Sequence, residues 1–281
     1  MLTALTLLAK FSLYLGALFS IGGQIHSALD IYYKKRILYF ALSAVIVGAS
    51  LKLGLANAQL GGELSAFFKS DTFNWVWQSN GAQFLAFLIG ALSGLFSAWI
   101  KHKLSRYIGI AISVLCLSAG FALSGHTQSV EDAPLLPFWI IPHILIAGFW
   151  VFAPISLWPH ASLPNVDVMV KTERFSRLAV WMIPILFVTG IYLLWRLNPQ
   201  ISDIWTTFYG QLLFAKFSIA LGLLGLGALN KLHVTRLLKI VPEKGRAALR
   251  RTLTIEAILF LAVILIILLA TTLTGPGGHH H

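Results

Sequence analysis

The sequence is poor in charge and in cysteine, and each shortage excludes classes of protein. Only 11% of its 281 residues are charged, whereas a soluble domain carries about 25%. So few charged side chains cannot cover a globule in water, which excludes an ordinary soluble enzyme, a disordered chain and a coiled coil. The single cysteine, Cys116, excludes an intramolecular disulfide and a cysteine-rich zinc or iron–sulfur site.

Short catalytic motifs are lacking as well. The sequence contains no nucleophile elbow, no phosphate-binding loop and no dinucleotide fingerprint. We therefore predict that the chain is not an enzyme and that it does not hydrolyse ATP.

Apolar residues make up 57% of the sequence and are gathered in long runs. A membrane helix needs about 20 mostly apolar residues. Eight runs meet this length, and the first is too long for a signal peptide. No connection can hold a soluble domain, so we predict one all-α domain over residues 1–274, an eight-helix transmembrane bundle, with a linker and purification-tag remnant at 275–281. The predicted spans lie near 5–28, 37–56, 78–100, 106–124, 138–158, 176–197, 208–232 and 252–273.

Lysine and arginine are distributed unequally between the two sets of loops. Sixteen of the 21 follow spans one, three, five and seven, and only Lys69 and Arg196 lie in the opposite loops. Because cytoplasmic loops carry the excess of positive charge, we expect both termini to lie outside the cytoplasm, in the periplasm if this is a Gram-negative inner membrane. We therefore interpret the formal net charge of +11 as a sign of membrane orientation and not of a nucleic-acid partner.

Small residues recur within two of the runs. The third run carries Gly90 and Gly94 within a four-residue repeat, and the seventh carries Gly222, Gly225 and Gly227. Such residues let two helix backbones approach closely in lipid. We expect both sets to pack against neighbouring helices.

Two histidines mark a candidate metal site at the outer face. His126 directly follows the fourth run and His143 lies near the start of the fifth, with Glu131 and Asp132 in the short connection between them. Neutral imidazole is a good ligand for copper, zinc or iron, and the carboxylates could add oxygen ligands. The alternative is a solvated His126 and a hydrogen-bonded His143 without metal. Sulfur ligands for Cu(I) are scarce, because the chain has only three methionines.

Four of the polar residues within the apolar runs are secondary candidates: His26, Lys216, Asn230 and Glu256. A charge at the bilayer centre costs roughly 2.5–3.5 kcal/mol on insertion scales, so each is a functional hypothesis. The alternative is a buried polar clamp between helices. For Glu256 we expect an inner cation such as Arg250 as partner.

The second half of the sequence resembles the copper resistance protein D (CopD) family of bacterial inner-membrane proteins. The resemblance covers about residues 120–273, and residues 1–119 agree in helix count. It rests on Gly125-His126, His143-Ile-Leu-Ile-Ala-Gly-Phe-Trp150, Arg174-Phe-Ser176, Tyr209-Gly-Gln-Leu-Leu-Phe-Ala-Lys216, Gly227-Ala-Leu-Asn230, and Leu249-Arg-Arg251 followed by Glu256.

This resemblance implies copper transport across the inner membrane, together with a small periplasmic copper-binding partner of the CopC type. It implies that His126 and His143 form the outer copper site, with Lys216, Asn230 and Glu256 as shared polar positions. The sequence departs from the family at two places. Many members have a second histidine where this chain has Trp139, and another early in the first span, where this chain reads 10–14 as Lys-Phe-Ser-Leu-Tyr.

Copper transport and homeostasis is therefore the function predicted from the sequence, with copper bound or carried as an ion. Two alternatives stay open. Paired histidines in a helical bundle can hold haem b in an electron-transfer protein. A non-transporting assembly or docking protein could instead present its outer loops to a periplasmic copper protein.

Overall fold

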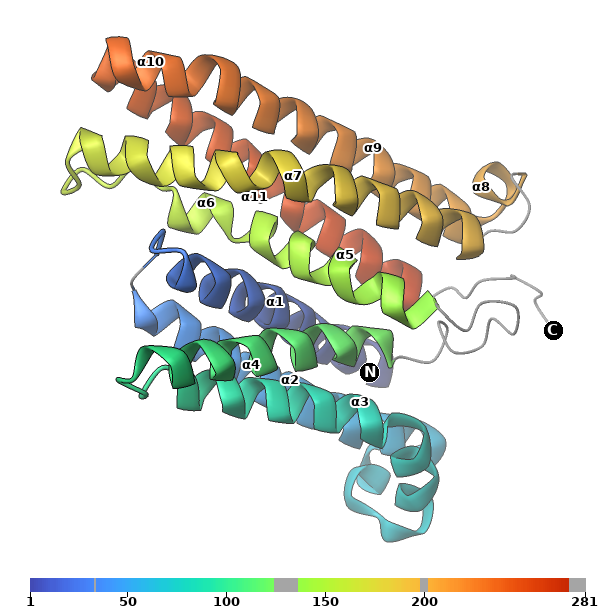
Figure 1. The fold of residues 1–281 in the computed structure, drawn as a ribbon. Coiled ribbons are helices and arrows are strands. Elements are labelled where there is room, and N and C mark those ends of the chain that lie inside the picture. Colours follow the sequence, from blue (N-terminus) through green and yellow to red (C-terminus); the bar gives the residue numbers. More distant parts are fainter. Residues whose placement is uncertain (33, 124–135, 198–201, 273–281) are drawn as a thin grey trace.

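The computed structural model describes residues 1–32, 34–123, 136–197 and 202–272, and this part of the chain is helical without strands (Figure 1). Eight of its helices are long and apolar enough to cross a membrane, which confirms the predicted all-α bundle of eight spans. In chain order the elements are α1 (Leu2–Ala28), α2 (Lys35–Leu60), η1 (Leu64–Phe68), α3 (Ser70–Ser97), α4 (Lys103–Ala122), α5 (Leu136–Val151), α6 (Ala153–Ser156), α7 (Asn165–Leu197), α8 (Asp203–Thr206), α9 (Phe208–Leu229), η3 (Asn230–Val234), α10 (Thr235–Ile240) and α11 (Pro242–Thr272).

The helices form two groups that meet along α1 and α5. Helices α1 to α4 pack closely on one another, and α9 packs on α11 in the other group. Figure 1 shows α5 lying between the two groups, with α7, α9 and α11 beyond it. The Lys10 ammonium donates to the Thr271 carbonyl at 2.8 Å, so the start of α1 and the end of α11 lie at the same end of the bundle.

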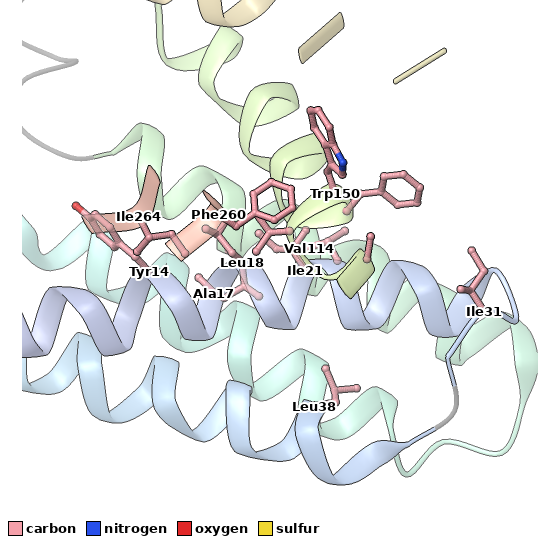
Figure 2. Close-up of a cluster of buried hydrophobic side chains, with 14 of the residues drawn as sticks. Tyr14, Ala17, Leu18, Ile21, Ile31, Leu38, Val114, Trp150, Phe260 and Ile264 are labelled. Carbon is pink, nitrogen blue, oxygen red and sulfur yellow. The ribbon is translucent and has the colours of Figure 1, made fainter. Parts of the chain in front are cut away.

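Helix α1 lies at the centre of the hydrophobic core. Its residues Leu13, Ala17 and Ile21 are fully buried. Figure 2 shows side chains from other helices gathered along it, among them Trp150 of α5 and Phe260 of α11. In a bilayer this core is held by packing contacts, because lipid tails are as apolar as the side chains themselves.

Glycines allow α1 to touch its neighbours with its backbone. A Cβ added at Gly22 would lie 2.2 Å from the Gly148 carbonyl oxygen of α5, and one added at Gly48 of α2 would lie 2.7 Å from the Leu13 nitrogen. The predicted close packing of the third span is also confirmed, since a Cβ at Gly90 would lie 2.9 Å from the Leu117 nitrogen of α4. These crossings set the spacing of the first five helices.

The corresponding prediction for α9 is wrong. A Cβ added at Gly222 or Gly225 would have nothing within 4 Å, and one at Gly227 would meet only Trp150 at 3.8 Å. Small residues permit a close approach but do not cause one. Helix α9 packs mainly on α11, and α7 mainly on α5, which leaves these glycines facing open space.

We expect Gly22→Val to lower the stability of the protein. Overpacking a well-packed core costs about 1–3 kcal/mol, and here the new side chain would meet the backbone of α5. Thermal unfolding of the detergent-solubilised protein measures the loss. Gly222→Val is the matched control and should leave the midpoint unchanged; equal midpoints for the two variants would contradict the assigned crossing of α1 and α5.

Candidate functional site

His143 lies on α5 and is held by α7. Its Nδ1 is 3.0 Å from the Thr189 hydroxyl oxygen, and that hydroxyl is itself 2.9 Å from the carbonyls of Ile185 and Leu186. Because a carbonyl oxygen only accepts hydrogen bonds, the single hydroxyl hydrogen of Thr189 is donated to these backbone carbonyls. The Thr189 oxygen therefore accepts a hydrogen bond from His143 Nδ1–H. The Nε2 atom therefore carries the lone pair with which a neutral imidazole binds a metal.

One member of an aromatic pair lies close to His143 in the sequence of α5. Trp139 precedes His143 by about one turn on α5, and its ring lies 5.0 Å from that of Tyr192 on α7, centroid to centroid. On α7, a Cβ added at Gly190 would lie 3.2 Å from the His143 Cε1. Helix α7 thus fixes the orientation of His143 through Thr189 and Gly190.

Lys216 is the charged neighbour of this histidine. It is half-buried on α9, and its ammonium interacts electrostatically with the His143 ring. A positive charge there opposes a cation on the imidazole. A copper ion bound at His143 therefore needs negatively charged ligands from elsewhere to offset Lys216.

The other residues predicted for the outer site, His126, Glu131 and Asp132, lie outside the described residues. Among the residues that are described, no group of three or more His, Cys, Asp or Glu could hold a metal ion. The geometry of the site thus consists of one oriented imidazole, its threonine and its lysine.

His26, a secondary metal candidate, is held by hydrogen bonds within the protein. It is fully buried; its Nε2 lies 3.0 Å from the Phe149 carbonyl and its Nδ1 lies 2.7 Å from the Ser156 hydroxyl. The carbonyl requires a hydrogen on Nε2, so Nδ1 accepts from Ser156. Both ring nitrogens are engaged, and a metal would have to displace one of these bonds.

The sequence explains why a histidine is needed at this place. Pro154 has no N–H and cannot continue the backbone bonds of the helix, and the chain breaks between α5 and α6 at Phe152. His26 bonds both sides of that break, Phe149 before it and Ser156 after it. It joins α1 to the interrupted fifth span.

Asn230 and Glu256, the polar candidates near the inner end, are bonded to each other. The Asn230 amide donates to Glu256 Oε1 at 2.8 Å, and its Oδ1 accepts from the Thr252 hydroxyl at 2.6 Å. The expectation of an arginine partner for Glu256 is not met, because the hydrogen-bond partner is this amide. Glu256 is only 3% exposed.

A change from α-helix to π-helix occurs at Asn230. The segment η3 is a π-helix between α9 and α10, and it begins at Asn230. The Thr235 hydroxyl donates to the Asn230 carbonyl at 2.9 Å. Single π-turns within α-helices are frequent at functional sites, and this one carries the amide that holds Glu256.

Two other lysines within the spans serve as clamps. Besides its bond to Thr271, the Lys10 ammonium donates to the Thr272 hydroxyl at 3.0 Å. The Lys52 ammonium donates to Gln83 Oε1, and the Gln83 amide donates to the Gly120 carbonyl at 2.8 Å. The first clamp joins α1 to α11, and the second joins α2 to α3 and α4.

Basic residues also converge on the connection between α6 and α7. Arg246 of α11 donates to the Leu163 carbonyl at 3.0 Å and to the His160 carbonyl. Burial, and the charges of Lys34 and Lys171, lower the pKa of His160. A neutral ring is consistent with its Nε2, 3.4 Å from the Lys34 ammonium, accepting a hydrogen bond.

Together these observations define a class: a polytopic helical membrane protein with isolated, hydrogen-bonded polar groups inside its spans. Residues 170–270, which cover most of α7 and continue into α11, match the family model of copper resistance protein D. Over these residues the match confirms the resemblance predicted from the sequence. Neither the curated proteins nor the solved structures contain a match.

The matched region divides the candidate residues. Lys216, Asn230 and Glu256 lie within it, whereas His26 and His143 lie before it. The match indicates a role in copper resistance or homeostasis. The hydrogen-bonding partners Thr189 and Thr252 also lie in the matched region, and sequence reasoning missed both, since threonine in an apolar run gives no distinctive signal.

We expect His26→Leu to destabilise the protein. The change leaves the Phe149 carbonyl and the Ser156 hydroxyl without their partner, and each buried unsatisfied group costs about 1–3 kcal/mol. Chemical unfolding of the solubilised protein measures this. His233→Leu is the control, because His233 is exposed on η3. An unchanged stability of His26→Leu would contradict the structural role.

Proposed function

We propose that the protein transports copper across the bacterial inner membrane and receives it at the outer face from a periplasmic protein of the CopC type. The observation that carries the proposal is the family match over residues 170–270. On this proposal His126 and His143 bind the incoming ion, and the carboxylates Glu131 and Asp132 offset the charge of Lys216.

The geometry of His143 supports this assignment. Metal-ligating histidines almost always donate their second ring N–H to a fixed acceptor, which sets the tautomer and the ring orientation. Thr189 supplies that acceptor at 3.0 Å. His26 lacks this arrangement, because both of its nitrogens are engaged within the protein. We therefore assign copper contact to His143 and no copper contact to His26.

Copper accumulation in cells tests the proposal. We expect cells with and without the protein to differ in copper content. The double change His126→Ala plus His143→Ala should abolish the difference, because it removes both imidazoles. His233→Ala is the matched control and should retain the difference. Equal copper content with and without the unaltered protein would refute transport.

A second variant tests the role of the threonine. Loss of an outer-shell partner of a metal ligand typically costs 10–100-fold in metal affinity or activity, so Thr189→Val should weaken copper binding by about this factor while His143 stays in place. Copper titration of the purified protein, with the histidines of 279–281 removed, measures it. Unchanged affinity would show that Thr189 does not orient a copper ligand.

We also propose that both termini lie outside the cytoplasm, on the basis of the lysine and arginine distribution. In a Cys116→Ser background, Ser65→Cys places a thiol on η1 and Ser162→Cys places one between α6 and α7, both at exposed positions. A membrane-impermeant maleimide should label the first in intact spheroplasts and the second only after lysis. The reverse pattern would invert the orientation.

A further inference from the structure

A cavity in the second group of helices is not used by the proposed copper site. It has a volume of about 440 Å³ and lies between α5, α7, α9, η3 and α11. Small-molecule sites commonly have volumes of about 300–1,000 Å³, with mostly apolar walls and a few convergent polar groups. His143 and Lys216 are not among its lining residues.

The cavity has mostly apolar walls and a few polar groups. Trp150, Ile183 and Phe187 belong to the apolar walls. Asn230 and Glu256, which are hydrogen-bonded to each other, belong to the polar part. The other polar lining residues are Lys231 and the hydroxyl-bearing Thr172, Ser176 and Thr235. The cavity therefore has an apolar part for a chain or ring and a polar part for a head group.

The cavity opens sideways, toward the lipid. Val180 on α7 and Leu224 on α9 line it and are 42% and 38% exposed. Helix α7 packs mainly on α5 and helix α9 mainly on α11, and the two helices have few contacts with each other. In a membrane the exposed rim faces hydrocarbon, so a ligand that uses this opening must itself be soluble in the bilayer.

The charges around Glu256 restrict the head group. Neither the Lys69–Glu63 nor the Lys239–Glu173 ion pair includes Glu256. Lys231 also lines the cavity, but it is exposed, whereas Glu256 is buried. At the buried pair an anionic head would meet the Glu256 carboxyl group, and a cationic head would have to lose its water at a cost of several kcal/mol. A neutral head with a hydroxyl group avoids both penalties, because the hydroxyl can donate to the carboxylate and accept from the Asn230 amide.

We propose that this cavity binds a membrane quinol, the reduced form of a quinone, with a ring hydroxyl at Glu256 and Asn230 and the isoprenoid chain leaving between Val180 and Leu224. A flat ring suits the aromatic walls, since aromatic groups gain from stacked and edge-on contacts. The hydroxyl group matches both members of the polar pair, because it can donate to the Glu256 carboxylate and accept from the Asn230 amide. The proposal is independent of the copper site and does not require electron transfer.

Binding of decylubiquinol, a short-chain quinol kept reduced during the measurement, to the protein in nanodiscs of quinone-free phosphatidylcholine tests this. We expect saturable binding with one quinol per protein, followed by the quenching of tryptophan fluorescence. Gly227→Leu, which extends a side chain into the cavity, should abolish saturable binding. Gly222→Leu is the matched control on the same helix and should retain it, because Gly222 faces open space.

The head-group contact has its own variant. Glu256→Gln keeps the shape of the side chain, and removal of a hydrogen bond to a charged group should weaken binding about tenfold. Thermal unfolding of every variant reports folding, and Ala228→Phe, which fills the cavity from an exposed position, replaces Gly227→Leu if that variant fails to fold.

Two outcomes would overturn the proposal. Non-saturable partitioning that is the same in all variants would mean that the quinol dissolves only in the bilayer. Loss of binding in Gly227→Leu together with full affinity in Glu256→Gln would mean that the cavity binds any acyl chain and that Glu256 does not recognise a head group. Copper accumulation is measured separately, so either result leaves the copper proposal unaffected.

Discussion

The contact of helix backbones at glycines along α1 is the constraint on which the rest of the structure depends. In lipid there is no hydrophobic driving force between apolar helices, so association relies on close van der Waals packing. Gly22 brings α1 against the backbone of α5, and Gly48 brings α2 against Leu13. The core of Figure 2 follows this arrangement. Because α5 is held this closely, His26 can reach both sides of the break that Pro154 imposes on the fifth span.

The second group of helices is built differently, and the difference is physical. Helix α7 packs mainly on α5 and helix α9 mainly on α11, and a cavity lies among these helices. Gly222 and Gly225 of α9 have no neighbour within reach of an added Cβ. A hydrogen-bonded network links Thr252, Asn230 and Glu256 at the point where α9 changes to a π-helix. A tightly packed first group thus supports a more open second group that carries the family match.

The charged and imidazole side chains inside the spans were identifiable from the sequence, but their partners were not. A charged or imidazole side chain is conspicuous in an apolar run because its insertion is costly. Its partner is often a threonine, a serine or a backbone carbonyl, which the same run tolerates without any signal. Thr189 beside His143 and Ser156 beside His26 are of this kind. The position of a residue along a helix predicts its depth in the membrane well. It predicts poorly which way the side chain faces and which helix lies next to it.

The sequence by itself determined that the protein crosses a membrane eight times, where each span lies, and which family it resembles. Bilayer thickness sets the length of an apolar run, so these features are encoded locally. Only the tertiary structure decided which glycines are buried, that His26 is a structural clamp, and that Glu256 meets Asn230 and not an arginine. These depend on which helix faces lie opposite each other, and that choice is made by packing over the whole bundle, which no single span encodes.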